Sequence, residues 1–148
     1  MSKFYCYFDG ACDCNPGGNM GIGVVIKDKD GKIVVTKSDM IKRKSGNTNN
    51  VAEHIALRQL LEYFVGKIGN EIYISGDSQM VINQATGRMK IKRGSYVEHG
   101  KQTLLELEDV KKNNVVFMRW IPREQNEEAD ALSKKAIGTN KNDGWVRA

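Results

Sequence analysis

The sequence has few cysteines and lacks the long apolar runs that membrane-spanning proteins need. Its 148 residues include three cysteines, Cys6, Cys12 and Cys14, which stand close together. An odd number of clustered cysteines argues against a disulfide framework. No run approaches the roughly 18 apolar residues that cross a bilayer as a helix, and the first residues lack the apolar segment of a signal peptide. These absences predict a cytoplasmic protein.

Histidine is also scarce, which limits the kinds of metal site that the chain can build. The two histidines, His54 and His99, are far apart in the sequence. Cys12 and Cys14 form a Cys-x-Cys pair, but no second pair of ligands follows at the spacing of a zinc site. We therefore expect no zinc site, and we expect the thiols to be buried or idle.

No strong excess of charge is present either. The chain has 23 Lys and Arg against 18 Asp and Glu, a formal net charge of +5. This excess permits an anionic partner, but it is far below that of a ribosomal-type polycation. Positive residues gather in two clusters, Lys42–Lys44 and Arg88–Arg93. Such clusters are usually solvated surface, so they indicate nucleic acid only if other features do.

The pattern that is present alternates strands and helices in a chain of ordinary single-domain length. Strand-like segments are 3–9, 21–27, 32–37, 71–75 and 115–120. Helix-like segments are 48 or 49 to about 64, 78–85, 97–112, and 124 or 126 to 136. Short links predict an antiparallel meander of the first three strands, and helical crossovers predict that the last two are parallel to their predecessors. We expect an α/β domain, a mixed five-stranded sheet flanked by helices, over residues 1–137, followed by a polar tail over 138–148.

Four acidic residues fall where this fold would bring them together. Asp9 follows the first strand and Asp77 follows the fourth, and sites form at the carboxyl ends of parallel strands. Glu53 lies near the start of the first long helix, and Asp130 lies beside the apolar stripe of the last. A turn, an N-cap, a helix dipole or a surface charge explains each residue singly, but not their convergence. Clustered carboxylates repel one another and favour hard cations such as Mg²⁺ or Mn²⁺.

Four ordered motifs, which together span nearly the whole chain, resemble the signatures of type 1 ribonuclease H in its archaeal-like and plant-like form. They are Asp9–Gly17 (with Asn15-Pro16-Gly17), Thr48–Glu53, Asp77–Gln79 and Trp120–Ser133. The resemblance implies the ribonuclease H-like fold, with strand order 3-2-1-4-5 and strand 2 antiparallel. It also implies an endoribonuclease that hydrolyses the RNA strand of RNA–DNA hybrids and leaves 5′-phosphate and 3′-hydroxyl ends.

The same resemblance assigns roles to residues. It implies two Mg²⁺ ions about 4 Å apart, with Mn²⁺ as a possible substitute. The implied catalytic and metal-binding residues are Asp9, Glu53, Asp77 and Asp130. The implied substrate-binding residues are Gly10, Asn15 and Gln79 on the RNA strand, and Thr48, Asn49 and Asn50 around a phosphate of the DNA strand. Thr48 also stands near a predicted helix N-terminus, which is a ready phosphate site.

The chain departs from many bacterial members at two places. The basic connection Arg88–Tyr96 is too short for the long protrusion that they carry. The loop Ile121–Gln125 lacks the histidine that is thought to assist proton transfer or metal release. We expect that Glu124 or Glu127, or solvent alone, takes that role.

Three other interpretations stay open at this point. The chain could be a catalytically weak module that binds hybrids, a nuclease of related fold that acts on other nucleic acids, or a segment of a reverse transcriptase polyprotein. The intact set of four acids argues against the first. The initial Met and the compact length favour a free-standing enzyme. We expect this enzyme to be a monomer that needs no obligate protein partner and does not bind a membrane.

Overall fold

One mixed sheet of five strands organises the computed structural model, which describes residues 2–14, 17–91, 94 and 96–137. The strands are β1 (Ser2–Cys12), β2 (Met20–Asp28), β3 (Ile33–Ile41), β4 (Asn70–Gly76) and β5 (Val115–Trp120). Their order is β3-β2-β1-β4-β5. β2 is antiparallel to both β1 and β3, whereas β1, β4 and β5 are parallel. The predicted strand order and directions are confirmed.

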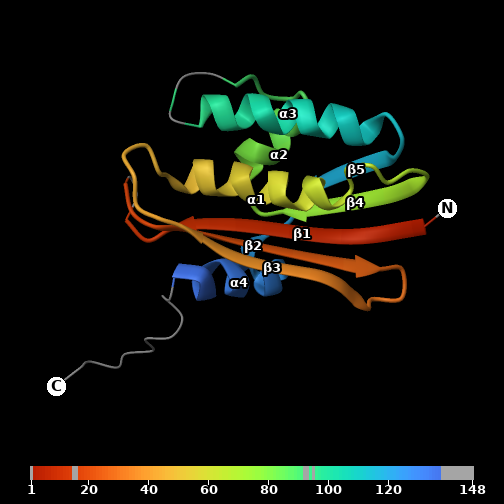
Figure 1. The fold of residues 1–148 in the computed structure, drawn as a ribbon, viewed down its shortest axis with the longest axis horizontal. Helices are drawn as coiled ribbons and strands as arrows, with labels where there is room; N and C mark the ends of the chain where they lie inside the picture. The colour runs from red at the N-terminus through yellow and green to blue at the C-terminus, as the bar shows by residue number, and fades with distance from the viewer. Residues whose placement is uncertain (1, 15–16, 92–93, 95, 138–148) are drawn as a thin grey trace.

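The helices cover both faces of this sheet. They are α1 (Asn49–Tyr63), α2 (Gln79–Ala85), α3 (Val97–Lys111) and α4 (Glu127–Ile137), and a short 3-10 turn, η1 (Arg123–Gln125), precedes the last. Figure 1 shows α1, α2 and α3 on one face and α4 alone on the other. Within the described ranges, no helix is long and apolar enough to cross a membrane.

The third strand is longer than its sequence pattern predicted. The prediction ended at Lys37, but β3 continues to Ile41, where it pairs with Met20 of β2. β3 is an edge strand, and Ser38, Asp39 and Met40 are exposed. The exposed part of an edge strand does not need alternating apolar residues. The sequence pattern that indicates a strand therefore stops before the strand does.

The core lies mainly between α1 and the sheet. Phe8, Ile22 and Ile74 of the sheet pack with Leu57 and Phe64 of the α1 segment, and all five are buried. Burial of each such side chain contributes about 1.5–3 kcal/mol, so this face of the sheet fixes the position of α1 and of the residues that it carries.

On the opposite face, two glycines let α4 lie directly on β2. A Cβ atom at Gly21 would overlap the Ser133 carbonyl oxygen, and one at Gly23 would overlap the Ala129 carbonyl oxygen. The backbone of the helix therefore touches the strand, which brings Asp130 close to the sheet. The tail over 138–148, with Trp145, lies outside the described residues, so the proposed domain boundary stays a prediction.

Candidate metal centre

The site begins where the pairing of β1 with β4 ends. Phe8 of β1 pairs with Gly76, the last residue of β4, so the residues that follow them, Asp9 and Asp77, lie next to each other. The sequence pattern placed Asp9 after the first strand, but Asp9 lies inside β1, which continues to Cys12 beside β2. Asp9 is 3% exposed, and Asp77 is partly exposed. The convergence that the sequence predicted for these two acids is thus a consequence of the β1–β4 pairing. Ser78, not Asp77, caps α2 by accepting from Val81 N at 3.3 Å.

Glu53 reaches the same place from α1 because the helix packs on β1 at a glycine. A Cβ atom at Gly10 would lie 2.5 Å from the Glu53 nitrogen. The Gly10 N–H donates to Asp9 Oδ1 at 2.9 Å and to Glu53 Oε1 at 3.1 Å. Glu53 lies beyond the first turn of α1, so a role as a partner of the helix dipole does not explain it.

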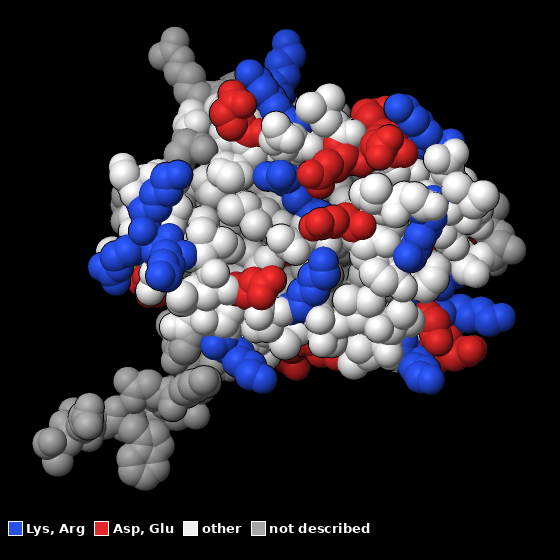
Figure 2. Space-filling model, in the orientation of Figure 1, with Lys and Arg blue, Asp and Glu red and all other residues white. Residues whose placement is uncertain are grey.

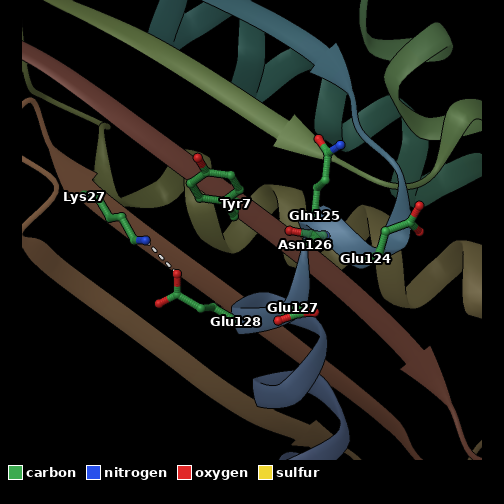
Figure 3. Close-up of a pocket in the computed structure, with 7 residues that line it drawn as sticks. All are labelled: Tyr7, Lys27, Glu124, Gln125, Asn126, Glu127 and Glu128. Carbon is green, nitrogen blue, oxygen red and sulfur yellow. Dashed lines mark hydrogen bonds and ion pairs between the residues drawn. The ribbon is translucent and has the colours of Figure 1, made fainter.

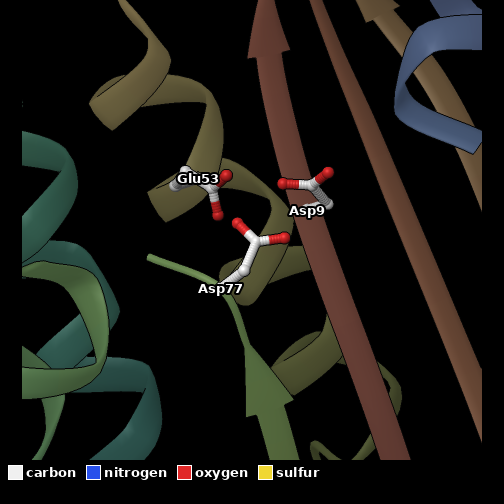
Figure 4. Close-up of side chains that lie close together, drawn as sticks. All are labelled: Asp9, Glu53 and Asp77. Atoms are coloured by element: carbon white, nitrogen blue, oxygen red, sulfur yellow. The ribbon is translucent and has the colours of Figure 1, made fainter. Parts of the chain in front are cut away.

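The three carboxylates point toward one another (Figure 4), and one oxygen of each lies within 4.8 Å of the others. The Glu53 Oε2 atom is buried and, among the described residues, has no hydrogen-bond partner. Leaving a buried polar group without a partner costs about 1–3 kcal/mol, and more for a charged group. Three acids in this arrangement are unfavourable unless a proton or a cation joins them.

The proton affinities follow from this crowding. Burial, and to a smaller extent the charges of Asp77 and Asp130, raise the pKa of Asp9 to about 7, against the effect of a hydrogen bond with Glu53. Burial also raises the pKa of Glu53 well above its ordinary value, and Asp9 adds to the effect. A divalent cation removes both penalties, and a set of hard oxygen ligands suits Mg²⁺ or Mn²⁺. The residues present therefore fit such an ion.

Asp130 lies beside this group but is not part of it. Its Oδ2 atom is 3.1 Å from Lys134 Nζ, and its Oδ1 atom is 3.4 Å from Arg123 Nη2. Burial raises the pKa of Asp130, but a hydrogen bond with Asp9 and the two cations outweigh it and lower the pKa. Asp130 therefore stays ionised. The structure brings the fourth acid next to Asp9 and balances it with positive charge.

The residues predicted to bind a DNA phosphate lie at the start of α1. The Thr48 hydroxyl accepts from Val51 N at 3.2 Å and caps the helix. Asn49 Oδ1 accepts from Cys12 N at 2.8 Å, which ties the helix start to the end of β1. Asn50 is exposed. The contact of these residues with nucleic acid stays a prediction.

The residues predicted to contact RNA are spread over three segments. Gly10 is buried against α1 and donates its N–H to the acids. Gln79 is exposed as the first residue of α2. Asn15 lies outside the described residues. Their contacts with RNA are not tested by the geometry and stay predictions.

Sequence reasoning missed the polar residues that support the acids. Lys134 stands four residues after Asp130, a spacing that places two side chains together on a helix, so this ion pair could have been found. Arg123 gives no such signal, because it reaches Asp130 from the η1 turn. Asn126 was part of a recognised motif, but no periodicity shows that its side chain turns inward.

The two glutamates expected to replace the loop histidine lie in a different environment. Glu124 and Glu127 line a pocket that also contains Tyr7 and Lys27 (Figure 3). Lys27 Nζ is 2.6 Å from Glu128 Oε1 in the same pocket. Neither Glu124 nor Glu127 belongs to the group of acids whose oxygens converge.

The positive cluster Lys42–Lys44 is exposed and precedes α1. Figure 2 shows Lys and Arg side chains at the end of the molecule that carries this connection, and charges of both signs over much of the rest of this face. The cluster therefore lies at the same end of the sheet as the acids, whereas Lys92 and Arg93 of the second cluster lie outside the described residues.

Comparison with known proteins gives consistent results. Residues 7–136 match the model of a family described as reverse transcriptase-like. The chain is 34% identical over 142 residues to ribonuclease HI of Halobacterium salinarum, which covers 91% of this chain and 64% of that protein. The N-terminal RNase H domain of Rv2228c from Mycobacterium tuberculosis, solved as a fusion with maltose binding protein, superposes with a TM-score of 0.81 at 26% identity, over 98% of this chain and 100% of that one.

A third similar structure carries nucleic acid. LC11-RNase H1 in complex with an RNA/DNA hybrid superposes with a TM-score of 0.74 at 30% identity, over 93% of this chain and 99% of that one. The chain spans 64% of the length of the Halobacterium protein and between 34% and 57% of the length of some other relatives, but 92–97% of the length of others. Several relatives are therefore longer than the domain described above.

Proposed function

Because this chain belongs to the reverse transcriptase-like family and, within it, to the type 1 ribonucleases H, we propose that it is an endoribonuclease that hydrolyses the RNA strand of RNA–DNA hybrids. The observation that carries this proposal is the convergence of three carboxylates, with one oxygen of each within 4.8 Å of the others, where the pairing of β1 with β4 ends. The products are 5′-phosphate and 3′-hydroxyl ends. The enzyme acts in the cytoplasm as a monomer.

The acids hold Mg²⁺, two ions per site, and Mn²⁺ can replace it. Bound ions of this kind activate a water molecule and neutralise charge that develops on the phosphate. Asp9 and Asp77 would be best placed to hold both ions, because they lie next to each other where β1 and β4 stop pairing. Glu53 would offer a buried oxygen that has no hydrogen-bond partner among the described residues. Asp130 is held ionised by Lys134 and Arg123. It would hold the side of the site from which the water molecule attacks the phosphate.

The hybrid lies across the end of the sheet. Gly10, Asn15 and Gln79 meet the RNA strand, and the helix start at Thr48–Asn50 meets a phosphate of the DNA strand. The exposure of Asn50 and Gln79 supports these roles. The clusters Lys42–Lys44 and Arg88–Arg93 add a sequence-independent attraction, which weakens as salt rises.

Strand-specific cleavage tests this proposal. The protein is incubated with Mg²⁺ and an RNA–DNA hybrid, an RNA duplex or a DNA duplex, each labelled on one strand at a time. We expect cleavage of the RNA strand of the hybrid only, and none in the presence of a chelator. Equal cleavage of all three substrates would indicate a general nuclease, and binding without cleavage would indicate a hybrid-binding module.

A further inference from the structure

Asn126, the residue before α4, contacts both β1, next to Asp9, and Asp77, which follows β4. Its side chain is buried, with 1% exposed. The Nδ2 group donates to the Phe8 carbonyl oxygen at 2.9 Å and to Asp77 Oδ2 at 3.0 Å. Both partners accept hydrogen bonds, so the amide nitrogen is the end that faces them. Phe8 directly precedes Asp9, and Asn126 therefore links Asp77 to the backbone next to Asp9.

The main chain of Asn126 reaches the fourth acid. Its carbonyl oxygen accepts from Asp130 N at 3.0 Å, in the first turn of α4. Figure 3 shows Asn126 at the start of α4, next to β1. The connection from β5 to α4 is also held next to the end of β4. Trp120 Nε1, at the end of β5, donates to the carbonyl oxygen of Asp77, the residue after β4, at 3.0 Å. One buried residue thus touches the three segments that bear Asp9, Asp77 and Asp130.

The direction of this side chain is unusual for its position. Asn is favoured before a helix because its side-chain oxygen accepts an N–H of the first turn. Here the amide turns inward instead, and Oδ1 is buried without a partner among the described residues. This arrangement gives up a cap and leaves a polar atom unpaired. In exchange, the inward orientation of the Asn126 side chain gives the two hydrogen bonds to Phe8 and Asp77.

We propose that Asn126 is a positioning residue that holds the Asp77 carboxylate at its place beside Asp9, so that the acids can bind a divalent cation. With Oδ2 of Asp77 fixed by the amide, the orientation of the carboxylate is set before the ion arrives. The inference rests on the metal site of the proposed function, but not on its substrate. Loss of a residue that orients a metal ligand typically weakens metal affinity or activity by about 10–100-fold.

Asn114 provides a matched control at the other end of the sheet. It is also buried, with 8% exposed. Its Nδ2 group donates to the carbonyl oxygens of Lys67 at 2.9 Å and Val110 at 3.0 Å, and its Oδ1 atom accepts from Asn70 N at 3.0 Å. The Asn114 side chain therefore makes three hydrogen bonds, one more than that of Asn126, but it touches none of the acids.

The test compares Asn126→Ala and Asn114→Ala in the full chain without nucleic acid. Mn²⁺ is titrated, and the free ion is followed by electron paramagnetic resonance, while thermal unfolding reports stability. We expect both variants to unfold at lower temperature. Only Asn126→Ala weakens Mn²⁺ binding, by about 10–100-fold, and Asn114→Ala binds Mn²⁺ within about twofold of the wild type.

A second variant separates positioning from the start of α4. Asn126→Ser keeps a good N-cap residue, but its hydroxyl is too short to donate to both Phe8 and Asp77. We expect Mn²⁺ binding to stay weak in this variant. Binding as tight as in the wild type, or equal losses in the Asn126 and Asn114 variants, would overturn the inference.

Cleavage assays show which proposal fails if one does. In the Asn126 variants we expect kcat at a fixed Mg²⁺ concentration to fall by about 10–100-fold while KM for the hybrid changes little. A wild type that binds Mn²⁺ tightly but cleaves no hybrid would contradict the proposed function and leave the positioning role standing. A wild type that binds no Mn²⁺ would overturn both.

Discussion

Glu53 and His54 are neighbours in α1 and are both buried, yet their surroundings differ completely. His54 Nε2 forms a hydrogen bond with Gln84 Oε1 at 2.9 Å, and Nδ1 forms one with the Thr103 hydroxyl oxygen at 3.1 Å. Burial lowers the pKa of His54, so it is neutral and both ring nitrogens have partners. Glu53 instead faces Asp9 and Asp77, so that the carboxylate oxygens of three acids, all hydrogen-bond acceptors, lie close together.

The difference separates a structural polar group from a functional one. The His54 network joins α1 to α2 and α3, and only neutral groups take part in it, although the Gln84 Nε2 atom has no partner within the part of the chain that the structure describes. The acid cluster gathers charges of one sign and has an unpaired oxygen of its own. Such an arrangement lowers stability in the absence of a cation and is found where a site needs it.

The largest expected effect is the loss of activity in Asp77→Asn. This change keeps the shape of the side chain but removes a charge that the cation needs. We expect the rate of hybrid cleavage to fall by more than about 100-fold, because a ligand matters more than the residues that orient it. Hybrid binding in a chelator should change little. Asp109→Asn, on the exposed surface of α3, is the control, and full activity of Asp77→Asn would remove the metal assignment.

His54→Ala should show the opposite profile. It removes a buried ring and leaves Gln84 and Thr103 without their shared partner, so we expect the free energy of unfolding to fall by about 2–4 kcal/mol. Denaturant melts measure this change. The cleavage rate per folded molecule should change far less than in Asp77→Asn. A loss of activity as large as that of Asp77→Asn, without a loss of stability, would erase the distinction between the two neighbours.

The stabilisation by Mg²⁺ should increase with pH. In the metal-free protein Asp9 has a folded pKa of about 7, above its unfolded value, so its contribution to stability is present at low pH and is lost as pH rises through 7. Mg²⁺ takes the place of the proton. We therefore expect saturating Mg²⁺ to raise the unfolding temperature more at pH 8 than at pH 5.5. The corresponding gain in the free energy of unfolding should be larger at pH 8 by about 1–3 kcal/mol.

The same comparison isolates the acids from His54. The pKa of His54 is lowered, so this residue destabilises the folded state as pH falls, but it does so equally with and without Mg²⁺. Calorimetric melts at the two pH values, each with Mg²⁺ or a chelator, give the difference. A Mg²⁺ effect that is independent of pH would contradict the protonation of the acids in the metal-free state.

The smallest expected effect belongs to Glu124→Ala and Glu127→Ala. Both residues line the pocket with Tyr7 and Lys27 rather than the group of acids. We expect kcat and its pH profile to stay within about twofold of the wild type, which would leave proton transfer to solvent. A tenfold loss in either variant would show that this residue replaces the missing histidine.

Much of the fold could be predicted because its signals are local. The turn residues between β2 and β3 and the helical crossovers after β3 and β4 determine the order and direction of the strands. Asp9 and Asp77 could be placed together because they lie next to each other where two neighbouring parallel strands stop pairing, although β1 itself continues to Cys12. The extent of β3 could not be predicted, because solvent on an edge strand removes the apolar alternation.

Other parts of the site depend on contacts between distant segments. The approach of α1 to β1 at Gly10 brings Glu53 to Asp9, and a glycine in the sequence does not indicate which helix will pack against it. The inward turn of Asn126 depends on the exact place of Phe8 and Asp77. Arg123 reaches Asp130 across a turn. Contacts of this kind depend on how distant segments pack in three dimensions, and they produce no periodic pattern in the sequence.

The most direct test of the account is to locate Mn²⁺ in crystals by anomalous scattering. The account predicts ions bound among Asp9, Glu53 and Asp77, with Asp130 at the margin of the site, and the loss of at least one ion in Asp77→Asn. Anomalous density elsewhere on the molecule, with none among these three carboxylates, would contradict the central claim.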